Sequence, residues 1–187
     1  YAPSPYPHRR RELLEFLRDS KAVHFTDTTT RDMTQSNTGN RFRLAEDALI
    51  GPYLDSCNFF SMENGGGAHF HVAMMANMTY PFAEAQAWNR FAPKTLKQLL
   101  VRSTNVLGYA PQPRNVMNIT GEMICDNYQI IRCFDFLNDV RNMRPLAEVA
   151  LSRDDVVFEP ALSISLGAKC SIGDQMHPSG EMNLSTY

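Results

Sequence analysis

The sequence has little excess charge, few cysteines and no long apolar run. Its 187 residues carry 18 Lys and Arg against 20 Asp and Glu, a net charge of -2, so no basic field favours nucleic-acid binding. The four cysteines contain no C-x-x-C pair, which argues against a zinc ribbon and favours a reducing compartment. The longest uncharged stretch, residues 64–83, contains Asn, His, Pro and three adjacent glycines, so it is not a membrane span.

The chain divides into three parts by composition. Residues 1–20 hold a proline-rich linker and a leading amphipathic helix over 9–20, whose basic start, 8–11, is expected to be solvated. Residues 21–165 form the main domain. Residues 166–187 lose helical periodicity and gain Gly, Ser, Met, Cys and His, so we interpret them as an atypical tail. A frameshift or a truncation is our hypothesis for it.

Short apolar runs alternate with helix-like segments along the main domain. The predicted strands are 22–25, 59–62, 99–101, 130–134 and 156–158. The predicted helices between them are 44–56, 82–91, 116–125 and 141–151. This alternation indicates βα units and a parallel sheet.

A parallel sheet of this kind is either an open doubly wound sheet or a TIM barrel. Polar groups follow four of the five runs, which favours a barrel because a barrel collects its site at the carboxyl ends of many strands. No G-x-G-x-x-G or phosphate loop follows the first run, which argues against the open sheet. The fold class is therefore α/β, a partial TIM (β/α)8 barrel of about five N-terminal βα units, and we expect a fragment of a longer protein.

Four ordered motifs resemble one enzyme family. Residues 25–36 read F-T-D-T-T-T-R-D-M-T-Q-S and resemble the D-T-T-x-R-D-x-x-Q-S segment of the carboxyltransferase domain shared by pyruvate carboxylase, the oxaloacetate decarboxylase alpha subunit and the transcarboxylase 5S subunit. Residues 60–68 resemble S-M-E-N-W-G-G-A. Residues 99–109 resemble L-L-R-G-A-N-x-V-G-Y, and residues 132–138 resemble R-x-F-D-S-L-N.

The resemblance implies transfer of a carboxyl group between carboxybiotin and a 2-oxo acid of the pyruvate or oxaloacetate type, assisted by a divalent metal (Zn, Mn, Co or Mg). Asp32 matches the metal ligand of the family. Arg31, Gln35 and Asp135 match catalytic positions, and Gln35 also matches a substrate contact. Arg102 matches the arginine that holds the substrate carboxylate, a task for which the planar guanidinium is suited because it can donate two hydrogen bonds to one carboxylate. Tyr109 matches a tyrosine beside the keto acid. For Glu63, a site role and a structural role are equally supported.

Each of these residues also has a structural interpretation. Asp32 could cap a helix or pair with an arginine, Arg31 and Gln35 could lie in a solvated loop, and Tyr109 could be a core residue. Arg102 and Asp135 could form a salt bridge at the rim of the barrel.

The sequence departs from the family at several positions. Gly65 replaces a tryptophan, Thr34 a histidine, and Ser103-Thr104 a Gly-Ala pair. His69 and His71 replace a threonine and an aspartate, and they would share a face as a second metal site only if that segment were extended.

The resemblance also implies parts that this sequence does not match. The family's metal shell needs a carbamylated lysine and a later His-x-His pair, and the context of Lys169 does not match the lysine motif. Cys170 with His177 is a weakly supported zinc pair. We therefore expect the chain alone to be inactive and the whole protein to be an oligomer working with biotin carboxylase and biotin carrier modules, in the cytoplasm or the mitochondrial matrix.

Two other functions stay open at this stage. The shorter D-x-x-x-R-D pattern also occurs in aldol-type lyases and synthases that act on acyl-CoA. Alternatively, the chain is a non-catalytic copy whose exposed sheet edges favour association with another subunit.

Overall fold

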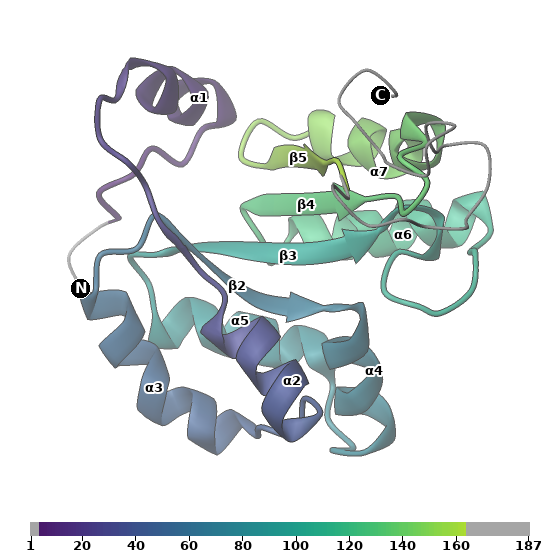
Figure 1. Ribbon diagram of the computed structural model, residues 1–187, viewed down its shortest axis with the longest axis horizontal. Helices are drawn as coiled ribbons and strands as arrows, with labels where there is room; N and C mark the ends of the chain where they lie inside the picture. The colour runs from purple at the N-terminus through teal and green to yellow at the C-terminus, as the bar shows by residue number, and fades with distance from the viewer. Residues whose placement is uncertain (1–3, 164–187) are drawn as a thin grey trace, which may run out of the picture.

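The computed structural model describes residues 4–163, which form a five-stranded parallel sheet with helices packed along one face (Figure 1). The strands are β1 (Thr26–Asp27), β2 (Ser61–Gly66), β3 (Leu96–Arg102), β4 (Ile130–Phe134) and β5 (Val157–Ala161). They pair in the order β1-β2-β3-β4-β5, each parallel to the next along the chain. A doubly wound sheet reverses its strand order at a switch point, so this order confirms the partial barrel.

The predicted helices form close to their expected bounds. They are α1 (Arg10–Asp19), α3 (Leu44–Ser56), α5 (Pro81–Phe91), α6 (Arg114–Cys125) and α7 (Val140–Leu151). Proline at the first position of α5 and the Asp139 carboxylate, which accepts from the Arg141 amide at 3.0 Å, explain two of these starts. The short segments η1 (Thr29–Met33), α2 (Thr34–Thr38) and η2 (Ser103–Asn105), and the helix α4 (Gly67–Met75), were not predicted.

The outer face of the sheet carries the main core. Leu99 and Val101 of β3 and Ile131 of β4 are buried there together with Ile124 of α6 and Leu146 of α7. Each such side chain contributes about 1.5–3 kcal/mol by leaving water. Alternate residues of the same strands therefore face the opposite side, which is the interior of the barrel.

The strand predictions were wrong in two respects. Residues 22–25 are not a strand; Val23 and Phe25 are exposed, and β1 starts at Thr26. The strands β2 and β3 extend well beyond the predicted apolar runs, through buried polar residues such as Glu63 and Gln98. These residues face the interior, where polar side chains interrupt the apolar pattern that a sequence search detects.

The helix α1 lies at the amino-terminal ends of the strands (Figure 1). Its Leu13 packs with Leu96 and Ile130, whose side chains form the floor of the barrel interior. Arg10, predicted to be solvated, donates from Nη1 to the carbonyl oxygens of Ala150, Leu151 and Arg153, the last at 2.6 Å. Two of these carbonyls belong to the last turn of α7 and the third lies two residues after it, where a cation complements the carbonyl acceptors and the helix dipole.

Replacing Arg10 by alanine is expected to lower the free energy of unfolding by about 1–2 kcal/mol, because the carbonyls at the end of α7 lose their donor. The measurement is urea unfolding followed by far-UV circular dichroism. Arg11→Ala is the matched control, since Arg11 pairs with Glu15 in solvent and its loss is expected to cost under about 0.5 kcal/mol. Equal losses of unfolding free energy in the two variants would show that the contact between Arg10 and α7 does not stabilise the fold.

The tail prediction for 166–187 lies outside the described residues, as do Lys169, Cys170 and His177. Within residues 4–163, no helix is both long and apolar enough to cross a membrane.

Candidate active site at the carboxyl ends of the strands

The segment after β1 directs Arg31 into the barrel. The Asp27 carboxylate accepts from the Thr29 amide at 3.2 Å and from its hydroxyl at 2.7 Å, which closes the turn at the end of the strand. The π-helical turn η1 follows, a geometry often found at functional sites. Thr34, which replaces the histidine of the family, is buried and donates to the Thr30 carbonyl at 2.8 Å.

Glu63 is the centre of the charged network inside the barrel. Its side chain is fully buried. Its carboxylate accepts from Arg31 Nε at 2.5 Å and from Gln98 Nε2 at 3.2 Å, and it forms a salt bridge with Arg132 Nη1 at 3.2 Å. Two guanidinium groups and an amide therefore compensate its desolvation. Glu63 orients Arg31, which agrees with the structural role considered for it.

Arg132 is a residue that the sequence analysis did not single out, although it begins the fourth motif. It lies on β4 beside Glu159 of β5, and Arg132 Nε donates to Glu159 Oε1 at 3.0 Å. Its other contact is Glu63, so it is held between two carboxylates. Its inward-facing position on a strand, within a quoted motif, is the signal that could have identified it.

Arg102 is the last residue of β3, and no carboxylate among the described residues forms an ion pair with it. Its Nη1 donates to the Gly108 carbonyl at 3.0 Å, and its guanidinium carbon lies 4.7 Å from the centre of the Tyr109 ring. A Cβ on Gly67 would lie 3.4 Å from that carbon, so glycine leaves room for the guanidinium. Tyr109 is 60% exposed, so it is not a core tyrosine, and its ring meets that of His71 edge to face at 4.9 Å.

Asp135 organises the loop after β4. Its carboxylate accepts from Ser103 Oγ at 2.8 Å, Asn142 Nδ2 at 3.0 Å, and the amides of Leu137 and Asp139 at 3.1 Å each. Burial alone would raise its pKa, but these hydrogen bonds outweigh that effect and lower it. Within residues 4–163 no ion pair joins it to Arg102, so the rim salt bridge considered as the structural alternative for these two residues is not formed. Ser103, a departure from the family, supplies one of its partners.

Asp32 and Gln35 lie on the exposed side of the same segment. Asp32 Oδ1 accepts from Arg31 Nη1 at 2.9 Å, and more than half of the Asp32 side chain is exposed. Gln35 is exposed on α2. Among the described residues, no group of three or more His, Cys, Asp or Glu side chains is placed to hold a metal ion. Asp32 alone does not make a metal site there, so we derive no step through a metal.

The histidines after β2 separate because α4 is helical. His69 is buried, and its Nε2 lies 3.2 Å from Glu84 Oε2, whereas His71 is exposed beside Tyr109. The second metal site considered for this pair was therefore wrong, since the extended segment it required is not formed. At Gly65, a Cβ would lie 2.8 Å from Leu99 Cδ1, so the space for a larger side chain is already filled.

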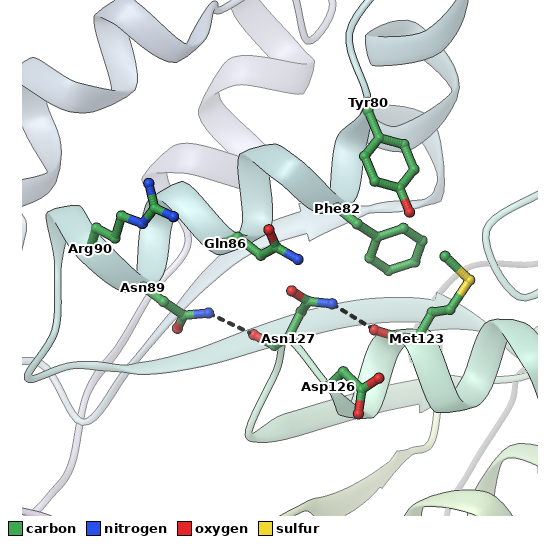
Figure 2. Close-up of a pocket in the computed structure, with 8 residues that line it drawn as sticks. All are labelled: Tyr80, Phe82, Gln86, Asn89, Arg90, Met123, Asp126 and Asn127. Atoms are coloured by element: carbon green, nitrogen blue, oxygen red, sulfur yellow. Dashed lines mark hydrogen bonds between the residues drawn. The ribbon is translucent and has the colours of Figure 1, made fainter.

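A groove between α5 and α6 is separate from this site (Figure 2). The rings of Tyr80 and Phe82 line one part of it, and Asn89 Nδ2 donates to the Asn127 carbonyl across it at 3.2 Å. It lies in the outer helical layer, and none of the predicted site residues lines it.

The sequence is similar to several pyruvate carboxylases. The chain is 36% identical to the mitochondrial pyruvate carboxylase of Rattus norvegicus over 150 residues, which cover 79% of this chain and 13% of that protein. It is 32% identical to the pyruvate carboxylase of Schizosaccharomyces pombe over 174 residues, 91% of this chain and 14% of that protein. The chain thus spans only a small part of the length of these relatives. No protein-family model matches the sequence.

Solved structures agree. The carboxyl transferase domain of Rhizobium etli pyruvate carboxylase with pyruvate matches with a TM-score of 0.80 and 30% identity, over 96% of this chain and 30% of that chain. The same domain with oxamate and biotin matches with a TM-score of 0.78 and 31% identity, over 84% and 27%. The sequential parallel strands, together with these matches, define the chain as part of a carboxyltransferase barrel. It belongs to the pyruvate carboxylase family and corresponds to the carboxyltransferase region.

Proposed function

We propose that this chain supplies the 2-oxo acid side of a carboxyltransferase site, at which a carboxyl group moves between carboxybiotin and a pyruvate-like acid. The observation that carries the proposal is Arg102. It projects from the carboxyl end of β3 and, among the described residues, contacts a carbonyl and an aromatic ring but no carboxylate. Arg31 and Arg132 are by contrast already paired with carboxylates. Of these three arginines, Arg102 is therefore the one left to receive a substrate carboxylate.

The other predicted residues take roles that follow from their positions. Arg31, fixed by Glu63, would place positive charge beside the keto group, and Tyr109 would position Arg102 through its ring. Gln35, exposed on α2, would donate an amide hydrogen bond to a bound ligand. Asp135 would act indirectly, by ordering the loop beside the site. Asp32 as a metal ligand stays a prediction, because its shell would need residues outside the described part.

The proposal includes partners and a setting. The carboxyl group would arrive on biotin held by a separate carrier module and loaded by a biotin carboxylase module, as the similarity to pyruvate carboxylases supports. The parent would be oligomeric and would lie in the cytoplasm or the mitochondrial matrix. The chain alone is proposed to bind the acid without turning it over.

The test is binding of oxamate to the full chain, measured by isothermal titration calorimetry. Arg102→Ala is expected to weaken binding at least about tenfold, because the carboxylate loses a two-point contact. The control is Arg141→Ala, since Arg141 is exposed near the same rim and pairs with Asp139. Unchanged affinity in Arg102→Ala, or no binding by the wild-type chain, would refute the proposed role.

A further inference from the structure

Glu159 is an inward-facing carboxylate that the proposed function does not use. It lies in β5 in register with Arg132 of β4, and the ion pair between them measures 3.0 Å. Its side chain is 43% exposed, so it faces the open space of the barrel interior rather than the packed core. A charge in that position acts on any ligand that enters the interior.

Two guanidinium groups face three carboxylates around this position. Arg31 pairs with Glu63 and Asp32, and Arg132 pairs with Glu63 and Glu159. Without Glu159, Arg132 would have only Glu63, which Arg31 already shares. Glu159 is therefore the one carboxylate that Arg132 does not share with Arg31, and it brings the net charge of these five groups to -1. Arg102, by contrast, has no carboxylate partner in the described part of the chain.

Arg132 lies close enough to the proposed carboxylate site to matter. In the sheet, Arg102 is in register with Phe134, so Arg132 lies on the neighbouring strand two residues nearer the floor. That places the two backbones about 7 Å apart along the strands and about 5 Å apart across them. An anion held by Arg102 is then within about a Debye length of Arg132, whose ion-pair partner Glu159 lies one strand further across the sheet.

We propose that Glu159 is a specificity-determining residue that makes this site prefer singly charged 2-oxo acids over doubly charged ones. The inference rests on the proposed function, in which Arg102 holds the first carboxylate. A second carboxylate would meet Glu159 and a neutralised Arg132 instead of a free cation. The carboxylated product carries one negative charge more than the acceptor, so Glu159 would favour its release.

The experiment compares two anions of similar size and different charge, oxamate and oxalate, at pH 7 and constant ionic strength. Their affinities for the full chain are measured for the wild type, Glu159→Gln and Glu148→Gln. Glu148 is a matched control because it pairs with Arg114 on the outer surface. Glu159→Gln is expected to raise the affinity for oxalate relative to oxamate about fivefold, and Glu148→Gln is expected to leave the ratio unchanged.

The outcomes separate this inference from the proposed function. An unchanged ratio in a folded Glu159→Gln variant overturns the role of Glu159, even if oxamate binding still depends on Arg102. A gain of oxalate binding in Glu159→Gln, with oxamate binding independent of Arg102, supports the role of Glu159 and refutes that of Arg102. No binding of either anion by any variant overturns both. Glu159→Asp provides a second variant, expected to keep the wild-type ratio because the charge remains.

Discussion

Replacing Glu63 by alanine is expected to lower the free energy of unfolding by about 3–5 kcal/mol. The variant leaves the guanidinium groups of Arg31 and Arg132 without the carboxylate that holds them, and the amide of Gln98 without its acceptor. Arg132 keeps Glu159 and Arg31 keeps Asp32, but both of these carboxylates are far more exposed than Glu63. The remaining pairs are therefore weaker. The measurement is the midpoint and slope of urea unfolding at pH 7.

The control for Glu63 is Glu148→Ala. Glu148 also forms a salt bridge with an arginine, but about half of each side chain is in solvent, so its loss is expected to cost at most about 1 kcal/mol. Glu63→Gln separates charge from shape, because it keeps one acceptor oxygen while losing the charge. It is expected to fall between the wild type and Glu63→Ala. A cost for Glu63→Ala no greater than that of Glu148→Ala would contradict a central role for the buried carboxylate.

The second large effect is a pH dependence set by Asp47 of α3. Burial raises the pKa of its carboxyl from 3.8 to about 6; His69 opposes this change, and the Glu84 carboxylate adds to it. The folded state therefore holds a proton between about pH 4 and pH 6 that the unfolded state has lost. This contribution to stability is complete below about pH 4 and is lost as the pH rises through about 6. From the shift, we expect it to fall by about 2–3 kcal/mol between pH 4 and pH 7.

The variant Asp47→Asn isolates this effect. Asparagine can still accept a hydrogen bond from Trp88 but does not ionise, so the stability of the variant relative to the wild type is expected to rise with pH between 4 and 7. The stabilities are compared by thermal unfolding at each pH. Asp19→Asn is the control, because Asp19 is exposed beside Arg18 and its difference from the wild type is expected to stay within about 0.5 kcal/mol. A difference between Asp47→Asn and the wild type that does not vary with pH would refute the effect of burial.

The alternation of apolar runs and helices was enough to predict the class of fold. Helix α3 and strand β4 have the predicted bounds, and α5, α6 and α7 differ by one or two residues at their starts. Helices α6 and α7 were predictable because each carries an apolar face toward the main core. The strands were harder, since polar residues interrupt their inward-facing side. Residues such as Glu63, Gln98 and Arg132 alternate inward and resemble loop residues in the sequence.

The sequence motifs predicted which residues lie near the rim but not which of them contact one another. Arg102 with Tyr109, and Arg31 with Asp32, are brought together as neighbours of the same loops. Asp135 makes different contacts from those expected, because its carboxylate bonds Ser103 and Asn142 instead of Arg102. The pairing of Arg132 with Glu159 joins residues 27 positions apart, which no local pattern indicates.

The sequence by itself determined the parallel α/β architecture, the family resemblance and the segments that end at the rim. These depend on local periodicity and on short motifs, which are properties of neighbouring residues. Only the tertiary structure decided that α1 lies at the floor and which of the three arginines has no carboxylate partner among the described residues. Ion pairing depends on strand register and on burial, and both are set by packing between segments that are distant along the chain.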